Sequence, residues 1–311
     1  MKKLLLALGF FISISVNAAE SVILMIGDGM GVGHVACRGK QGGFLATQTP
    51  AAMVSTSNSE GEITNSPPAA TAFSCGIKTR NGYAGVDRNG VPCPMMISRM
   101  ARDAGYTVVI ATNDSPIGGT PTPFFARSVN RYDAGDLRAQ FEATNIRVIS
   151  NEAGFGSSAM ARFPNRARPA RVEFGTQKIC MRGRRPFFVM VEEAAIDWTS
   201  HDGDFANTMR HMADFETAVQ SAIAFVKANH NITLIVVGDH ETGGLSPETC
   251  EFGSFGSHPN ASGANPNSSR FNHTGADVPL YAYGSKASLF QSATPIENDE
   301  VGRRIRSILF P

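Results

Sequence analysis

Several acidic and histidine side chains of this sequence stand directly after short apolar runs. Asp28, Glu192 and the pair Asp239–His240 each follow such a run. Apolar runs of this length are typical of buried strands, and ligands bind where the carboxyl ends of parallel strands meet. Carboxylate oxygen and imidazole nitrogen are ligands that zinc-type ions take in proteins. The pattern therefore predicts a metal centre at one edge of a sheet.

Two further segments add ligands of the same kind. Asp197 and His201 are four residues apart, so both side chains can face one ion if the backbone there is helical. His273 stands shortly before Gly275 and another apolar run. A single acid or histidine at any of these places has an ordinary explanation as a turn or surface residue. The prediction of a metal centre therefore depends on their combination.

A candidate nucleophile lies at the start of an alanine-rich segment. Ser66 is followed by Pro67 and, ten residues on, by Gly76, which predicts a helix with Ser66 as its N-cap and Gly76 at its end. A hydroxyl at a helix N-terminus lies where phosphate binds readily, and a metal ion could activate it. The alternative is a capped helix with no chemical role. The sequence has no G-x-S-x-G motif, so the usual serine hydrolase arrangement lacks its marker.

Strand and helix signals alternate along the chain and must position these side chains. Apolar or β-branched runs predict strands at 22–26, 107–111, 187–191, 233–237 and 278–283. Apolar residues at helical spacing predict helices at 96–104, 205–228 and 296–309. The alternation predicts an α/β fold, a three-layer α/β/α sandwich with a central, mostly parallel sheet.

The first residues have the pattern of an export signal. Lys2 and Lys3 precede an apolar run over 4–16, and small residues follow it up to Ala19. This predicts a signal peptide over 1–19 and export, with the bacterial periplasm as destination. The run is shorter than the roughly 20 apolar residues of a membrane helix, so no stable membrane insertion is expected. Residues 20–311 are then expected to form one compact catalytic domain.

The charge and the cysteine content say less about the partners and the disulfides of the chain. The net charge is +1, which gives no support to nucleic acid as a partner. Basic residues concentrate between Arg162 and Arg185, either as a solvated surface or as a patch that attracts anionic substrates. Disulfides are possible in an exported protein, but spacing does not tell which cysteines pair. The five cysteines are Cys37, Cys75, Cys93, Cys180 and Cys250.

Taken together, these segments resemble the alkaline phosphatase family of metal-dependent phosphomonoesterases. The resemblance runs in order through 27–31, 64–71, 82–87, 120–131, 191–201, 239–240 and 273–275. It implies the fold of that family, two zinc ions and one magnesium ion. Asp197, His201 and His273 would hold the first zinc, Asp28, Asp239 and His240 the second, and Asp28, Thr120 and Glu192 the magnesium.

The same resemblance implies the chemistry and the partners. Ser66 would attack phosphorus and form a covalent phosphoserine, and Arg131 would grip two phosphate oxygens with its planar fork. Asn65 would lie beside the bound phosphate. Small phosphate monoesters and inorganic phosphate are the expected ligands. The oligomeric state stays open, because the chain is short for the family and a homodimer is not assured.

Three positions depart from the pattern of the family. Asn65 stands where the family usually has aspartate, which predicts weaker positioning of Arg131. Pro67 and Pro68 each remove a backbone N–H that could face an anion. Gly118 stands where aspartate or histidine commonly supports the magnesium, so weakened magnesium binding is expected. The alternatives are a phosphodiesterase or related ester hydrolase of the same superfamily, and a weakly active relative that binds phosphate or metal.

Overall fold

The computed structural model describes residues 19–150, 161–162, 171–174, 177–180, 186–254 and 271–311. Its centre is an eight-stranded sheet in the order β13-β2-β12-β9-β1-β8-β3-β4. The strands are β1 (Ser21–Gly27), β2 (Ala52–Ser55), β3 (Thr107–Thr112), β4 (Arg147–Ile149), β8 (Phe187–Glu193), β9 (Ile232–Gly238), β12 (Val278–Gly284) and β13 (Ile296–Glu297). The signal-peptide prediction and most of the basic stretch fall outside the described residues.

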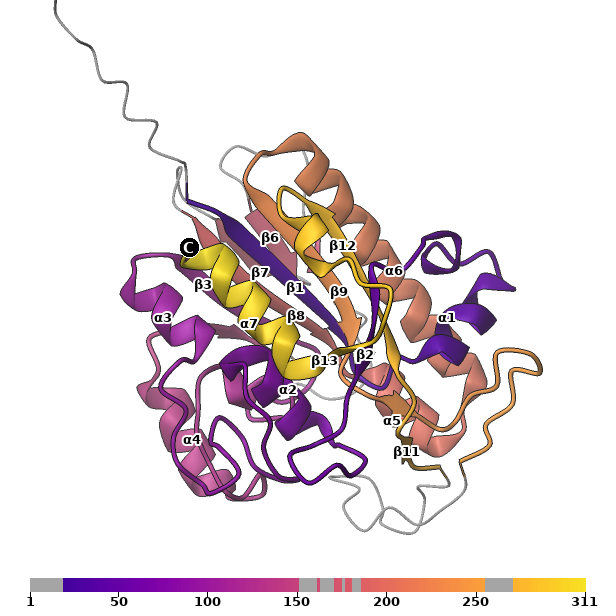
Figure 1. Ribbon diagram of the computed structural model, residues 1–311, viewed down its shortest axis with the longest axis horizontal. Helices are drawn as coiled ribbons and strands as arrows, with labels where there is room; N and C mark the ends of the chain where they lie inside the picture. The colour runs from indigo at the N-terminus through magenta and orange to yellow at the C-terminus, as the bar shows by residue number, and fades with distance from the viewer. Residues whose placement is uncertain (1–18, 151–160, 163–170, 175–176, 181–185, 255–270) are drawn as a thin grey trace, which may run out of the picture.

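Most neighbouring strands of this sheet are parallel. β1 pairs in parallel with both β8 and β9, and β3 pairs in parallel with β8 and β4. β12 is the exception, because it runs antiparallel to β9 and β2. The predicted mostly parallel α/β sheet is confirmed. Figure 1 shows β1 and β9 running toward the same edge of the sheet.

Helices cover both faces of the sheet. They are α1 (Val32–Gly39), α2 (Ser66–Cys75), α3 (Ile97–Asp103), α4 (Ala134–Ala143), α5 (Ala195–Asp202), α6 (Phe205–Ala228) and α7 (Asn298–Leu309). Side chains of β1 alternate between two cores: Ile23 and Met25 pack with α6, whereas Val22 and Leu24 pack with α2 and α7. Figure 1 shows α6 and α7 on opposite faces of the sheet, which gives the three layers.

Smaller elements complete the description. Two short strands, β10 (Glu241–Thr242) and β11 (His273–Thr274), pair antiparallel beside the main sheet. A separate three-stranded sheet contains β5 (Ala161–Arg162), β6 (Arg171–Phe174) and β7 (Gln177–Cys180). Short 3-10 helices are η1 (Leu45–Thr47), η2 (Thr122–Phe124) and η3 (Ala287–Phe290). No helix among the described residues is long and apolar enough to cross a membrane.

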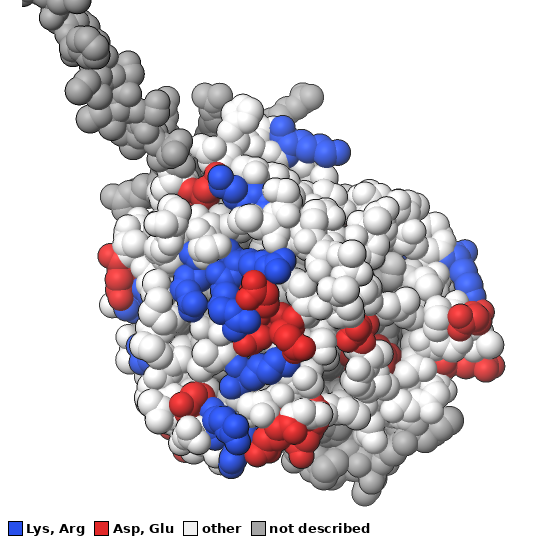
Figure 2. All heavy atoms as spheres, in the orientation of Figure 1, with Lys and Arg blue, Asp and Glu red and all other residues white. Residues whose placement is uncertain are grey.

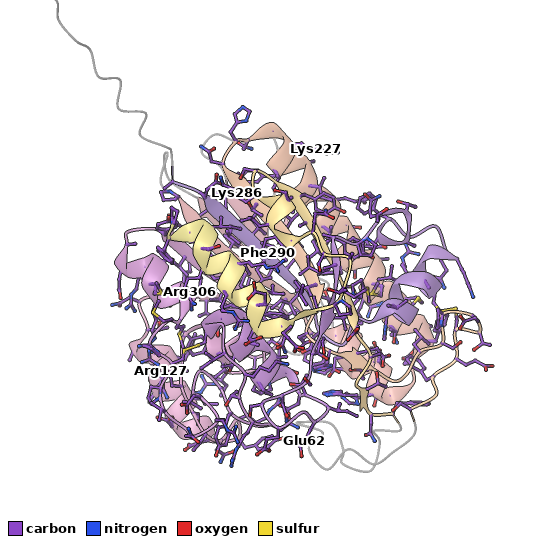
Figure 3. The ribbon with its side chains drawn as sticks, in the orientation of Figure 1. Glu62, Arg127, Lys227, Lys286, Phe290 and Arg306 are labelled. Atoms are coloured by element: carbon purple, nitrogen blue, oxygen red, sulfur yellow. A yellow bond between two sulfur atoms is a disulfide. The ribbon has the colours of Figure 1, made fainter. Side chains whose placement is uncertain are left out.

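The end of the chain differs from the prediction in one respect. The helix expected over 296–309 begins at Asn298, because Ile296 and Glu297 pair with β2 as the edge strand β13. Basic and acidic side chains mix over α7 in Figure 2, and they form ion pairs one turn apart, such as Arg304 with Glu300. Phe290 of η3 is fully buried in the core that α7 covers, as Figure 3 shows.

Helix α7 fixes the position of α2, the helix that begins at Ser66. Arg306 donates a hydrogen bond to the carbonyl of Cys75 at the end of α2 (Figure 3). A side chain at Gly302 would lie 2.2 Å from the carbonyl oxygen of Ala72, so the two backbones meet without a side chain between them. This close packing fixes the C-terminal half of α2 against α7.

Two disulfides join parts of the chain that spacing alone left unassigned. Cys37 of α1 is bonded to Cys250, with 5.7 Å between their Cα atoms. Cys75 at the end of α2 is bonded to Cys93, with 6.2 Å between their Cα atoms. Four of the five cysteines are therefore assigned to pairs.

Candidate active site

Strand register brings the predicted acidic residues to one edge. Gly27, the last residue of β1, is paired with Glu193 of β8 on one side and with Gly238 of β9 on the other. Asp28 directly follows Gly27 and Asp239 directly follows Gly238, so the two acids lie at the same level at the ends of neighbouring strands. Glu192 is level with Thr112, the last residue of β3. The three strand ends therefore deliver their carboxylates to one place.

The first group of candidate ligands is Asp197, His201 and His273. Their ligand atoms all lie within 4.8 Å of one another. Asp197 Oδ1 lies 3.4 Å from Nε2 of His201 and 3.4 Å from Nε2 of His273. Asp197 and His201 share one face of α5, as their spacing predicts. His201 Nδ1 contacts the Phe271 carbonyl at 2.6 Å, which leaves Nε2 facing the group.

The second group lies beside the first and shares Asp197 with it. Ligand atoms of Asp28, Asp197 and His240 lie within 4.8 Å of one another. His240 Nε2 lies 3.4 Å from Asp28 Oδ1 and 3.3 Å from Asp239 Oδ2. Asp239 Oδ1 accepts the backbone N–H groups of Gly29 and His240, both at 3.0 Å. Those two bonds turn the other oxygen of Asp239 toward the group.

Asp28, Thr120 and Glu192 form a third group on the far side of Asp28. The Thr120 hydroxyl donates to Asp28 Oδ2 at 3.2 Å, and it also stabilises the ionised carboxylate of Glu192. Glu192 is fully buried and accepts a hydrogen bond from the Thr112 hydroxyl. Two carboxylates and a hydroxyl are oxygen ligands of the kind that magnesium takes.

Each of three buried acids in the described part of the chain keeps one carboxylate oxygen without a hydrogen bond, as expected at a cation site. Asp28 Oδ1, Glu192 Oε1 and Asp239 Oδ2 are buried without a hydrogen bond among the described residues. Burial and neighbouring carboxylates raise the pKa of Glu192 to about 8 and that of Asp239 to about 7. The pKa of Asp28 is raised for the same reasons. Buried, unpaired carboxylates are costly, so these residues fit bound metal ions.

Histidine and aspartate compensate each other in the first group. Burial would raise the pKa of Asp197, but the imidazoles of His201 and His273 outweigh it and hold that pKa well below its usual range. Burial would lower the pKa of His273, but Asp197 raises it above 6.5. Asp197 therefore stays ionised and available to a cation.

The candidate nucleophile lies against the second group. Ser66 is 6% exposed, and its Oγ lies 3.3 Å from His240 Nε2. The helix prediction was wrong by one residue: Asn65 is the N-cap of α2, and Ser66 is the first helical residue. Pro67 and Pro68 occupy the following positions of the first turn, where their missing N–H groups have no partner within the helix. Gly76 ends the helix with φ 68°, as predicted.

Arg131 reaches the same place from the loop after η2. A side chain at Gly119 would lie 2.9 Å from Arg131 Nη2 and 3.2 Å from Ser66 Cβ. Gly119 thus leaves room for the guanidinium to approach Ser66. Asn65 accepts the N–H of Gly82 at 3.3 Å, and the Gly82 carbonyl accepts the N–H of Arg131 at 2.9 Å. Asn65 therefore helps to position the backbone of Arg131 through the backbone of Gly82.

Two buried side chains hold the ligand-bearing segments. His34 Nδ1 accepts from Gly31 N at 3.2 Å, so Nε2 carries the hydrogen and donates to Ser200 Oγ at 3.0 Å. Burial lowers the pKa of His34 to about 4, and the ring stays neutral. Ser200 lies on α5 between Asp197 and His201, so His34 orients that helix. Sequence spacing gave no signal for this role.

Glu241 joins two other segments of the site. Its carboxylate accepts the N–H groups of Gly244 and Leu245 and a hydrogen bond from the Thr274 hydroxyl. Thr274 follows His273 in β11, so this contact fixes the position of His273 relative to His240. The two imidazole rings stack with 3.7 Å between centroids.

The buried carboxyl groups predict how the metal-free protein responds to pH. Glu192 and Asp239 have raised pKa values when folded, against ordinary values of 4.5 and 3.8. Between about pH 5 and 8 the folded chain therefore holds more protons than the unfolded chain, and its stability falls as the pH rises. His273 acts in the same direction, and Asp197 does not titrate in this window. His34 acts in the opposite direction up to its ordinary pKa of 6.5, but the raised carboxyl groups outnumber it and decide the sign. We expect calorimetry to show a melting temperature roughly 5 °C or more lower at pH 8 than at pH 5.

Zinc-loaded protein is the control for that measurement. Metal ions bind the deprotonated ligands, so the stabilisation by zinc should grow over the same pH range. A metal-free melting temperature that rises from pH 5 to pH 8 would show that these carboxyl groups are not protonated in the folded chain.

Comparison with known proteins agrees with this geometry. The family model described as alkaline phosphatase matches residues 19–152 and 176–265. Alkaline phosphatase 4 of Bacillus subtilis is 25% identical over an alignment of 288 positions that covers 73% of this chain and 62% of that protein. Alkaline phosphatase H of Pseudomonas aeruginosa is 24% identical over an alignment of 392 positions, gaps included, that covers 89% of this chain and 82% of that protein. The chain spans about three fifths of the length of the first of these relatives.

Solved structures show the same fold. The alkaline phosphatase of the Antarctic bacterium TAB5 superposes with a TM-score of 0.66 at 22% identity, covering 94% of this chain and 99% of that one. A cold-active alkaline phosphatase from Shewanella gives a TM-score of 0.70 at 19% identity, covering 94% of this chain and 100% of that one. The family model covers well over half of the sequence, and the chain belongs to the alkaline phosphatase family.

Proposed function

We propose that the chain hydrolyses phosphate monoesters through a covalent phosphoserine on Ser66, with two zinc ions and one magnesium ion as cofactors. The observation that carries this proposal is the position of the Ser66 hydroxyl. It lies 3.3 Å from His240 Nε2, beside Asp28 and Asp239, each of which has one buried carboxylate oxygen without a hydrogen bond among the described residues. A nucleophile next to a cation site at a helix N-terminus is suited to phosphoryl transfer.

The ligands divide among three ions in this proposal. Zinc ions bound in the first two groups supply positive charge that favours an ionised serine oxygen and stabilises the charge on the phosphate oxygens. Asp197, His201 and His273 would hold one zinc, Asp28, Asp239 and His240 the other, and Asp28, Thr120 and Glu192 the magnesium. Asp28, Asp239 and Glu192 each keep one buried oxygen without a hydrogen bond among the described residues, which supports the assignment.

The chain's own residues perform the remaining steps. Ser66 Oγ gives its proton to solvent and forms a bond to phosphorus while the bond from phosphorus to the ester oxygen breaks, and the leaving oxygen takes up a proton and departs as the alcohol. Water then loses a proton and attacks phosphorus, the bond to Ser66 Oγ breaks, and Ser66 Oγ takes up a proton as phosphate is released. Arg131 holds two phosphate oxygens throughout with its planar guanidinium. The space beside Gly119 supports this role, because it lets the guanidinium approach Ser66.

The compartment and the extent of the catalytic unit belong to the same proposal. Two disulfides support an oxidising compartment, in agreement with export directed by residues 1–19. Residues 20–311 would act as one catalytic domain. Small phosphate monoesters and inorganic phosphate are its proposed ligands.

Three chromogenic esters test the substrate class. Protein loaded with zinc and magnesium is assayed on p-nitrophenyl phosphate, bis(p-nitrophenyl) phosphate and p-nitrophenyl sulfate. We expect kcat/KM for the monoester to exceed the other two by roughly 10²-fold or more. Preference for the diester would replace our proposal with a phosphodiesterase, and background rates on all three would indicate a binding protein.

A further inference from the structure

The loop after β3 places a carboxylate beside the third ligand group. Asp114 follows the end of β3 by two residues, and its backbone N–H donates to the Thr112 hydroxyl at 2.8 Å. That hydroxyl in turn donates to Glu192. Asp114 Oδ1 accepts the N–H of Ser115 at 2.6 Å, which fixes the side chain. The backbone of Asp114 is therefore tied into the same network as Glu192, and the Ser115 N–H fixes its carboxylate there.

The other oxygen of Asp114 fills the space that a side chain at position 118 would take. A Cβ built on Gly118 would lie 2.0 Å from Asp114 Oδ2. The backbone of Gly118 is not left-handed, so its conformation does not itself require glycine. The lack of a side chain at Gly118 is what leaves room for Asp114. Gly118 is also two residues before Thr120, the hydroxyl of the third group.

Charge in this region calls for a cation. The negative charge of Asp114 raises the pKa of Glu192, and the two residues are joined through the Thr112 hydroxyl. Glu192 Oε1 is fully buried without a hydrogen bond, which is an independent sign of a missing ligand. The positive charge of Arg131 lowers the pKa of Asp114, but the guanidinium lies beside Gly119 and Ser66. A divalent cation held by oxygen ligands would neutralise the acids on the side of Glu192.

We propose that Asp114 supplies a carboxylate to the magnesium site of Asp28, Thr120 and Glu192, in the place left open by Gly118. This inference rests on the proposed magnesium site. It changes the expectation drawn from Gly118 alone, because the charge missing at position 118 is provided by the preceding loop. Asp114 thus supports magnesium affinity, and weak binding is no longer expected.

Magnesium binding itself is the test. Calorimetric titration of Mg²⁺ into zinc-loaded protein is compared for wild type and Asp114→Asn, which keeps the shape of the side chain and removes its charge. We expect the variant to bind magnesium roughly 10–100-fold more weakly at unchanged zinc content. Asp103→Asn is the matched control, since Asp103 is an exposed acid paired with Arg102, and it should bind as wild type does.

A double variant tests the placement. Asp114→Ala should weaken magnesium binding, and Asp114→Ala combined with Gly118→Asp should recover much of the affinity. Room for the new side chain exists once Asp114 is shortened, with only a small shift needed at the Ser115 carbonyl, 3.1 Å from the added Cβ. Failure of the double variant to recover would overturn the view that Asp114 stands in for a side chain at position 118.

The remaining outcomes separate this inference from the proposal on which it rests. Glu192→Gln should abolish magnesium binding, and a wild-type affinity in that variant would refute the magnesium site itself. If Glu192→Gln loses magnesium while Asp114→Asn binds it normally, only the role of Asp114 is wrong. If Asp114→Asn is inhibited more weakly by phosphate but binds magnesium as wild type does, Asp114 would instead position Arg131, and the proposed role at the magnesium site would be wrong.

Discussion

Replacing Ser66 by alanine should lower kcat on p-nitrophenyl phosphate by roughly 10³-fold or more. The change removes the oxygen that lies 3.3 Å from His240 Nε2 and leaves the candidate metal ligands in place. Without that oxygen no covalent phosphoserine can form, and the remaining rate would come from direct attack by water. Steady-state kinetics on protein with two zinc equivalents measures this loss.

Ser74→Ala is the matched control for the nucleophile. Ser74 lies on the same helix, is fully buried, and donates to the Thr71 carbonyl at 3.4 Å and to the Cys75 sulfur at 3.6 Å. This variant should keep wild-type activity. Mass spectrometry of protein quenched during turnover should find phosphate on Ser66 in wild type. Activity of Ser66→Ala within tenfold of wild type would rule out the covalent route.

Replacing Asp197 by asparagine should weaken the binding of the first zinc ion by about 100-fold or more, and the loss of its charge beside Asp28 and His240 should weaken the second zinc as well. Asp197 is the residue that the two ligand groups share. Its ionised carboxylate lies between His201 and His273 and accepts the Thr242 hydroxyl at 2.5 Å. Asparagine keeps that shape and hydrogen bond but removes the charge. Metal analysis after dialysis against dilute chelator should find well under two zinc equivalents.

Asp202→Asn controls for a lost charge on the same helix. Asp202 is the exposed last residue of α5, and this variant should retain zinc as wild type does. Because His34 holds α5 through Ser200, the fold of Asp197→Asn should survive, and circular dichroism can check this. Two tightly held zinc equivalents in Asp197→Asn would remove Asp197 from the ligand set.

The sequence allowed much of this arrangement to be predicted. Apolar runs located the strands, and parallel pairing then required Asp28 and Asp239 to leave the sheet side by side. Helical spacing placed Asp197 and His201 on one face of α5. These features depend on regular backbone geometry, which residue patterns encode directly.

Other features depend on contacts between distant segments and could not be predicted. Asp114 stands shortly after the strand predicted at 107–111, but its approach to Gly118 follows from the path of the loop between them. His34 gained its role only when α1 packed against α5. The start of α2 moved by one residue because Asn65 adopts the extended cap conformation. In each case tertiary packing decided among local possibilities that the sequence left equal.

The disulfide between Cys37 and Cys250 has a consequence for proteolysis. It closes a covalent loop over a sequence separation of 213 residues, which includes the many trypsin-cleavable bonds between Arg162 and Arg185. A single cut anywhere between the two cysteines leaves both fragments joined as one molecule. Without a reducing agent, nicked protein would therefore have the mass of the intact protein plus one water. With a reducing agent, it would separate into two fragments.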